Sequence, residues 1–95
     1  MQELFIFEWD ERKNNINKRK HGISFEIAKY VFADINRIEL YDLEHSINED
    51  RYITIGIIDN VYVVVYTIRN TVYRIISARK ATKEETEFYE ENCGS

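Results

Sequence analysis

The chain has 95 residues and a net charge of −4, with 44% hydrophobic and 32% charged residues. This length allows one domain over residues 1–95, and the composition is that of a globular protein rather than a disordered one. A single cysteine excludes an internal disulfide, and two histidines without paired cysteines do not make a credible metal site. The acidic N-terminus and the lack of an apolar run of about 18 residues argue against a signal peptide and a membrane span. We therefore expect a cytoplasmic protein with no membrane contact.

The first third of the chain predicts one strand and two helices. Residues 4–8 contain two phenylalanines and an isoleucine in a pattern that is typical of a strand. Asp10 stands where a helix N-cap is expected, and Gly22 stops that helix after a run of basic residues. Ser24 is a second N-cap, and apolar residues recur at helical spacing over residues 25–33.

The remainder predicts an antiparallel sheet that ends in a helix. The apolar period changes to two over residues 37–41, and a polar loop over residues 42–50 follows. Three strands rich in Ile, Val and Tyr then cover residues 51–58, 61–69 and 71–79. Two-residue turns are expected between them, and Thr82 with Glu85 forms a capping box for a helix over residues 83–91. The predicted fold class is α+β, in the order β-α-α-β-β-β-β-α with a mainly antiparallel sheet.

The charge distribution within this sheet indicates an anion-binding face. Residues 61–83 contain five basic residues and no acid, so the local field there is positive although the whole chain is acidic. With two-residue turns, Arg69 and Arg74 become diagonal neighbours on one face, beside Tyr52 and Thr67. Two adjacent guanidiniums repel each other unless an anion lies between them, and a phosphodiester suits the planar fork of arginine.

Two further features leave alternatives open. The same register places Asp50 opposite Arg69, so a cross-strand ion pair accounts equally well for that arginine. The same register places a predicted core on the other face of the sheet, and this core consists of Ile53, Ile55, Ile57, Val64, Tyr66, Ile68, Tyr73 and Ile75. His21 has the position of a helix-end cap, and His45 beside Ser46 is poor evidence for a catalytic triad.

Three segments of the sequence, taken together, resemble the BrnT family of toxins. The first comprises Phe7-Glu-Trp-Asp10 with Lys13, Asn17 and the string from Lys20 to Glu26. The second is Asp42-Leu-Glu-His-Ser46 with Glu49 and Arg51, and the third runs from Arg74 to Thr82. The resemblance implies a RelE-like fold and a growth-arresting ribonuclease of a type II toxin–antitoxin system. It also implies a BrnA-like antitoxin, contact with operator DNA only through that antitoxin, and no cofactor.

The resemblance further implies a metal-free reaction in which the 2′-OH of RNA attacks the adjacent phosphate. Arg69 and Arg74 are then expected to hold the scissile phosphate, and His45 to transfer a proton, with Glu49 and His21 as the other candidates for that role. The residues expected to bind RNA are Lys20, His21, Arg51, Arg79 and Lys80.

Two other functions remain open at this point. One is a non-catalytic module that binds an antitoxin and regulates an operon, and the other is a toxin with a different target, such as a topoisomerase. A homodimer is also left open.

Overall fold

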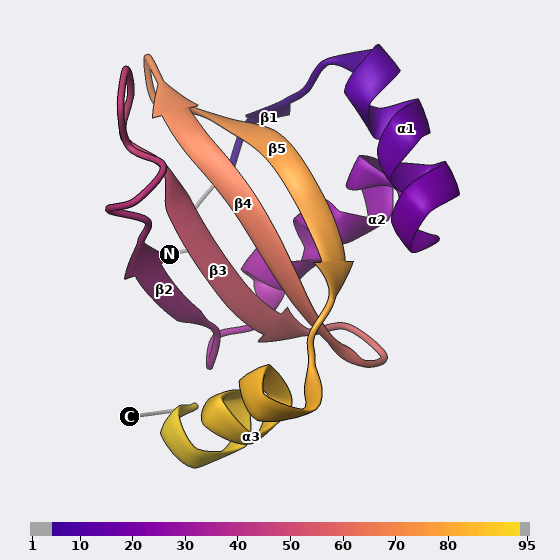
Figure 1. The fold of residues 1–95 in the computed structure, drawn as a ribbon, viewed down its shortest axis with the longest axis vertical. Coiled ribbons are helices and arrows are strands. Elements are labelled where there is room, and N and C mark those ends of the chain that lie inside the picture. The colour runs from indigo at the N-terminus through magenta and orange to yellow at the C-terminus, as the bar shows by residue number, and fades with distance from the viewer. Residues whose placement is uncertain (1–4, 94–95) are drawn as a thin grey trace.

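The computed structural model describes residues 5–93, which form a five-stranded sheet flanked by three helices (Figure 1). The elements in chain order are β1 (Phe7–Glu8), α1 (Glu11–His21), α2 (Phe25–Ala28), the 3-10 helix η1 (Lys29–Ala33), β2 (Ile38–Tyr41), β3 (Tyr52–Ile57), β4 (Val61–Arg69), β5 (Val72–Lys80) and α3 (Lys83–Asn92). The predicted α+β class is confirmed. Leu4, the expected start of the first strand, lies outside the described residues. No helix in the described part is long and apolar enough to cross a membrane.

The sheet has the strand order β1-β5-β4-β3-β2. β1 pairs with β5 in parallel, whereas the other three pairings are antiparallel. The first and last strands of the chain are thus neighbours, and β2 forms the far edge. Figure 1 shows α1 to the right of β5, α2 partly behind the sheet and α3 below its lower end.

Capping residues fix the helix boundaries where the sequence predicts them. The Asp10 carboxylate accepts hydrogen bonds from two backbone N–H groups of the first turn of α1, and Gly22 ends that helix with a φ of 74°. Ser24 caps α2 in the same way. Thr82 and Glu85 form the predicted capping box at the start of α3.

The two faces of the sheet carry separate apolar clusters. On one face, α2 and η1 pack against β4 and β5 through buried residues such as Phe25, Phe32, Val64 and Ile75. On the other face, Tyr89 of α3 packs against a smaller cluster: Ile55, Val61 and Val63. This second cluster covers only the end of the sheet near α3. The opposite end of the same face is therefore left for polar side chains.

The register of the first predicted hairpin is wrong by one residue. Ile57 pairs with Val61 and Tyr52 with Tyr66, so the connection has three residues, 58–60, rather than two. Because successive side chains of a strand point to opposite faces, this change turns all of β3 over. The isoleucines of β3 therefore lie on the α3 side and not with Val64, and Ile68, predicted to be buried, is 43% exposed.

The second hairpin has the predicted register. Arg69 pairs with Val72 and Thr67 with Arg74, which leaves a two-residue turn. Both turn residues have positive φ, 50° at Asn70 and 67° at Thr71. These values are those of a turn whose twist matches the flanking strands.

Helix α1 joins the sheet through buried polar residues rather than an apolar stripe. Asn17 is 6% exposed and donates hydrogen bonds to the carbonyls of Ile23 (2.9 Å) and Ala78 (2.8 Å). Its side-chain oxygen accepts from the N–H of Ala78 at 3.2 Å. The amide of Asn17 thus occupies the outer backbone groups of β5, as a neighbouring strand would. Asn14, also buried, accepts from the N–H of Phe25 at 2.8 Å.

Candidate active site

The loop of residues 42–51, between β2 and β3, is closed by its own hydrogen bonds. The N–H of Asp42 donates to the carbonyl of Arg51 at 2.9 Å. The Ser46 hydroxyl donates to the carbonyl of Asp42 at 2.6 Å and accepts from the N–H of Arg51 at 2.8 Å. Ser46 therefore braces the loop through backbone groups and is not aligned with His45 as a nucleophile would be.

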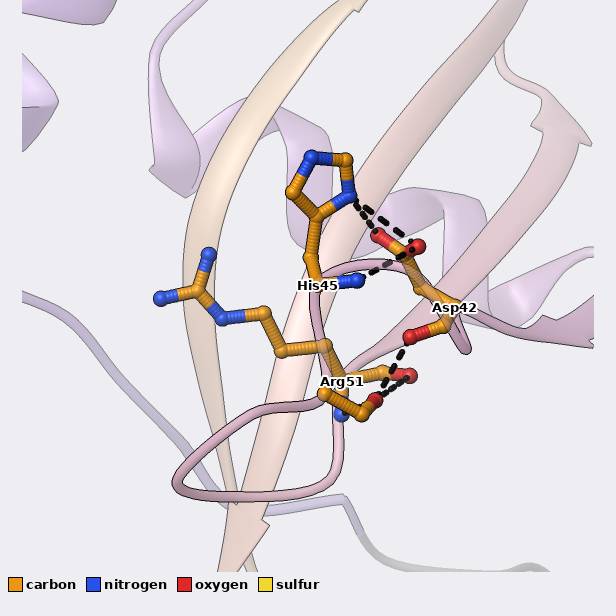
Figure 2. Close-up of polar contacts among 4 residues, drawn as sticks. Asp42, His45 and Arg51 are labelled. Atoms are coloured by element: carbon orange, nitrogen blue, oxygen red, sulfur yellow. Dashed lines mark hydrogen bonds and ion pairs between the residues drawn. The ribbon is translucent and has the colours of Figure 1, made fainter.

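His45 is held by a carboxylate of the same loop. Its Nδ1 lies 2.9 Å and 3.1 Å from the two side-chain oxygens of Asp42, as Figure 2 shows. The Asp42 side chain is 13% exposed and that of His45 is 59% exposed. A carboxylate on Nδ1 fixes the tautomer and orientation of an imidazole, so that Nε2 is free to exchange a proton.

Arg51 presents a guanidinium beside this pair. Figure 2 shows the Arg51 side chain extending away from the loop without a dashed contact at its tip. Within residues 5–93, no hydrogen bond or ion pair of this guanidinium is present, although its backbone is bonded to Ser46. His45 and Arg51 line a hollow of about 260 Å³ together with Ile47, Asn48 and Glu49. A free cation, an oriented imidazole and a carboxylate therefore meet in one concave place.

Arg69 of β4 contacts one residue of this hollow, Glu49. Its guanidinium donates to one oxygen of Glu49 through Nε at 3.2 Å and Nη2 at 3.0 Å. The expected partner Asp50 instead accepts from the hydroxyl of Tyr41 at 2.9 Å. An ion pair at Arg69 was thus correctly anticipated, but the acid was misassigned by one residue because the first hairpin has a longer turn.

Arg74 lies diagonally from Arg69 on the same face, as the register predicts, but it also has a carboxylate partner. Its Nη1 is 3.1 Å from an oxygen of Glu8 in β1. Thr67 lies on this face too, and its hydroxyl donates to the carbonyl of Asp50 at 2.6 Å. Tyr52 does not, because the turned-over β3 places it on the opposite face with Tyr66.

The remaining predicted RNA-binding residues lie elsewhere in the fold. Lys20 and His21 are exposed in the last turn of α1. This part of α1 lies near the end of β5, because Asn17 of α1 is hydrogen-bonded to Ala78 of that strand. Lys80 pairs with Tyr62 and Arg79 with Val63, also at that end of β5. These cations are therefore separated from the 42–51 loop by the length of the sheet.

Arg79 is engaged by an acid of α3. Its two terminal nitrogens contact the two oxygens of Glu85 at 2.7 Å and 2.8 Å. These bonds, with help from the N–H of Thr82, lower the pKa of Glu85 from about 4.5 to about 2, against the opposing effect of burial. The Arg79 contact therefore anchors α3, and phosphate would have to compete with Glu85 for that guanidinium.

Asp42 is the residue of this site that the sequence reasoning passed over. It stands three residues before His45 within the Asp42–Ser46 string, and that spacing was the available signal. Among the residues that the structure describes, no group of three or more His, Cys, Asp or Glu side chains could hold a metal ion.

Comparisons with known proteins identify the family and a similar fold. Residues 9–85 match the family model described as "Ribonuclease toxin, BrnT, of type II toxin-antitoxin system". The fold is similar to the crystal structure of the Brucella abortus ribonuclease toxin BrnT, with a TM-score of 0.65 and 20% sequence identity over 84% of this chain and 100% of that one. No protein of curated function matches the sequence. Because the family model covers most of the chain, including β2–β5 and the whole 42–51 loop, the chain belongs to the BrnT family of ribonuclease toxins of type II toxin–antitoxin systems.

Proposed function

We propose that the chain is a metal-independent endoribonuclease that arrests growth and is neutralised by a BrnA-like antitoxin. The observation that carries this proposal is the pairing of His45 with Asp42 beside the unpartnered guanidinium of Arg51. Family membership supplies the substrate class and the antitoxin partnership, and the loop supplies groups suited to phosphate chemistry.

The proposed reaction breaks an RNA chain without an external nucleophile. The 2′-OH attacks the adjacent phosphorus, and the bond to the 5′-oxygen of the next nucleotide breaks. The products are a 2′,3′-cyclic phosphate and a free 5′-OH. Such a reaction needs a base for the 2′-OH, a cation for the negative charge on the pentacoordinate phosphorus and an acid for the leaving oxygen.

The groups of the loop fit two of these requirements directly. Nε2 of His45 is the proposed proton-transfer atom, with Asp42 as the residue that positions the ring. Arg51 is the proposed phosphate ligand, because its planar fork matches two phosphate oxygens. Glu49 lies in the same hollow and is the second candidate for proton transfer.

Arg69 and Arg74 extend the site along the sheet. Their carboxylate partners are half-exposed or nearly so, with side-chain exposures of 32% for Glu49 and 42% for Glu8. Ion pairs at exposed positions contribute only about 0–1 kcal/mol, so a phosphate can displace either carboxylate. We propose that these arginines grip the scissile phosphate together with Arg51. Lys20, His21, Arg79 and Lys80, at the other end of the sheet, would then contact RNA outside the cleaved linkage.

The first test is cleavage of labelled RNA in EDTA by the full chain, freed of any co-purified antitoxin. The wild type should leave cyclic-phosphate ends. His45→Gln and Arg51→Gln should each slow cleavage at least about 100-fold, as removal of a proton-transfer group or a charge-stabilising donor does. Arg12→Gln is the matched control, since Arg12 is an exposed cation of α1 outside the site and its loss should leave the rate unchanged.

Three outcomes would contradict parts of the proposal. Cleavage at the wild-type rate by both loop variants would reject the 42–51 loop as the active site. Absence of cleavage by folded wild-type protein would reject the ribonuclease. Addition of a BrnA-like antitoxin should abolish cleavage, and cleavage that persists in a formed complex would reject the proposed neutralisation.

The carboxylates at Arg69 and Arg74 favour one second candidate, a non-catalytic module that binds an antitoxin and regulates its operon. In that case the arginines have a structural role, and Arg69→Ala with Arg74→Ala should lower stability without affecting any RNA. Loss of RNA cleavage by this double variant, with the antitoxin complex intact, would decide in favour of catalysis.

A further inference from the structure

A row of four tyrosines crosses the sheet on the face opposite Arg69. Tyr41, Tyr52, Tyr66 and Tyr73 come from β2, β3, β4 and β5 in turn, with neighbouring ring centroids 5.5–5.7 Å apart. The last three rings are nearly parallel, with interplanar angles of 27° and 22°, whereas Tyr41 meets Tyr52 at 69°. These residues, with Glu39, Leu40 and Ile68, line a groove of about 360 Å³. That volume lies within the range of small-molecule sites.

The groove adjoins the loop of the candidate active site at Tyr41. Tyr41 immediately precedes Asp42, and Tyr52 immediately follows Arg51. The Tyr41 hydroxyl donates to the carboxylate of Asp50, which ties the ring to the base of the same loop. A molecule bound at the loop would therefore have Tyr41, at the end of this groove, beside it.

The polar group of the groove has an unused acceptor. Oε1 of Glu39 accepts from Nε of Arg37 at 3.2 Å and from the hydroxyl of Tyr66 at 3.3 Å. Oε2 has no hydrogen-bond partner among residues 5–93, and the side chain is 45% exposed. The burial of Tyr66 and the negative charge of Glu39 raise the pKa of that phenol, so Tyr66 remains a donor to Oε1 at physiological pH. Oε2 is thus left for a donor from outside.

The orientation of the rings distinguishes between two kinds of ligand. A cation binds to the electron-rich face of a ring, but Tyr52, Tyr66 and Tyr73 turn their faces to one another. Tyr41, at the end of the row, is 49% exposed. One exposed ring beside an acceptor suits a flat group that stacks on Tyr41 and donates a hydrogen bond to Glu39. Nucleobases combine these two properties.

We propose that this groove binds the nucleobase next to the scissile phosphate and selects bases with an exocyclic amino group over uracil. The inference rests on the proposed function, since it assigns the base of an RNA whose phosphate lies at His45 and Arg51. Guanine, adenine and cytosine carry an amino donor for Oε2 of Glu39. Uracil offers only an imide N–H that lies between two carbonyl groups. The negative charge of a carboxylate is repelled by the oxygens of those two carbonyls.

The test measures nucleotide binding by calorimetry and so does not depend on cleavage. Guanosine and adenosine 3′-monophosphates should bind the full chain about tenfold more tightly than uridine 3′-monophosphate, the value of one additional hydrogen bond to a charged group. Tyr41→Ala should weaken every nucleotide about tenfold or more through lost stacking, whereas Tyr41→Phe retains the ring and most of the affinity.

Glu39→Gln is the decisive variant, because an amide can both accept and donate. Its affinities for the guanine and uracil nucleotides should become equal within about twofold, a ratio that a general loss of stability would not change. Glu44→Gln is the matched control, since Glu44 is an exposed loop acid outside the groove. That variant should keep the full preference.

Several results would overturn the inference. They are absence of nucleotide binding, equal binding of all bases by the wild type, and a preference that survives Glu39→Gln. Binding of an arginine-rich peptide that requires Tyr41 and Glu39, without nucleotide binding, would assign the groove to a protein partner instead. RNA cleavage without base preference would reject only the groove. Base preference without cleavage would reject only the ribonuclease.

Discussion

Asn17 is the residue whose replacement should reveal most about how α1 is held. Asn17→Ala removes three buried hydrogen bonds, to the carbonyls of Ile23 and Ala78 and from the N–H of Ala78. At about 1 kcal/mol each, their loss lowers the free energy of unfolding by about 3 kcal/mol, more if the backbone groups stay dry and unpaired. The greater helix propensity of alanine returns about 0.5 kcal/mol. We therefore expect a net loss of about 2.5 kcal/mol.

The assay is urea denaturation followed by the fluorescence of Trp9, which packs against Phe25. A loss of about 2.5 kcal/mol corresponds to a decrease in Tm of roughly 10–20 °C for a domain of this size. Asn15→Ala is the matched control: the residue is exposed in the same helix, so only the small propensity gain should remain. Asn17→Asp should also destabilise, because a carboxylate cannot donate to either carbonyl. If Asn17→Ala and Asn15→Ala differ by less than about 1 kcal/mol, the amide does not secure α1 to β5.

Three further predictions concern packing, strain and charge. Gly56→Ala should cost about 1–3 kcal/mol, because its Cβ would lie 2.8 Å from Cγ1 of Val31; an unchanged urea midpoint would show that η1 can shift freely. Thr71→Gly should stabilise by about 1 kcal/mol in the same assay, since a β-branched residue is strained at a φ of 67°, and a loss of stability would contradict this. The pKa of Glu85 is lowered to about 2 by Arg79, so its contribution to stability is present above pH 4.5 and is lost as the pH falls towards 2. Urea midpoints measured across that range should decrease more steeply for the wild type than for Glu85→Gln, and parallel curves would refute the assignment.

The helix boundaries could be predicted because their signals are local. Asp10, Ser24 and Thr82 each accept hydrogen bonds from the first turn of the helix that follows, an interaction that only a few neighbouring residues determine. The second hairpin was likewise predictable, since Asn70 and Thr71 separate two runs that are rich in β-branched and aromatic residues.

The first hairpin shows where such reasoning ends. Ile58 is apolar and reads as the last residue of a strand, but it lies in the turn, where its N–H donates to the carbonyl of Asn60. Pairing energies of the whole strand decide between turns of two and three residues, and they are not visible in the turn sequence. The parallel pairing of β1 with β5 was not predicted for a similar reason, because it joins residues far apart in the chain.

The sequence predicts that the loop residues of the candidate site lie close together, but it does not predict which acid Arg69 contacts. His45, Glu49 and Arg51 share one loop, so their proximity follows from the sequence alone. Arg69 joins them through Glu49, a contact between positions 20 residues apart. The roles of the loop residues remain predictions until cleavage is measured.

The position of β1 has a consequence for synthesis of the protein on the ribosome. Glu8 and Arg74, joined by an ion pair, are 66 residues apart in the chain. Of the five strands of the sheet, β1 is synthesised first, but its neighbour β5 is synthesised after the other four. Contacts of such long sequence separation form late in folding. A chain terminated before β5 has no neighbour for β1 and no Arg74, so the candidate site is complete only after β5 has been synthesised.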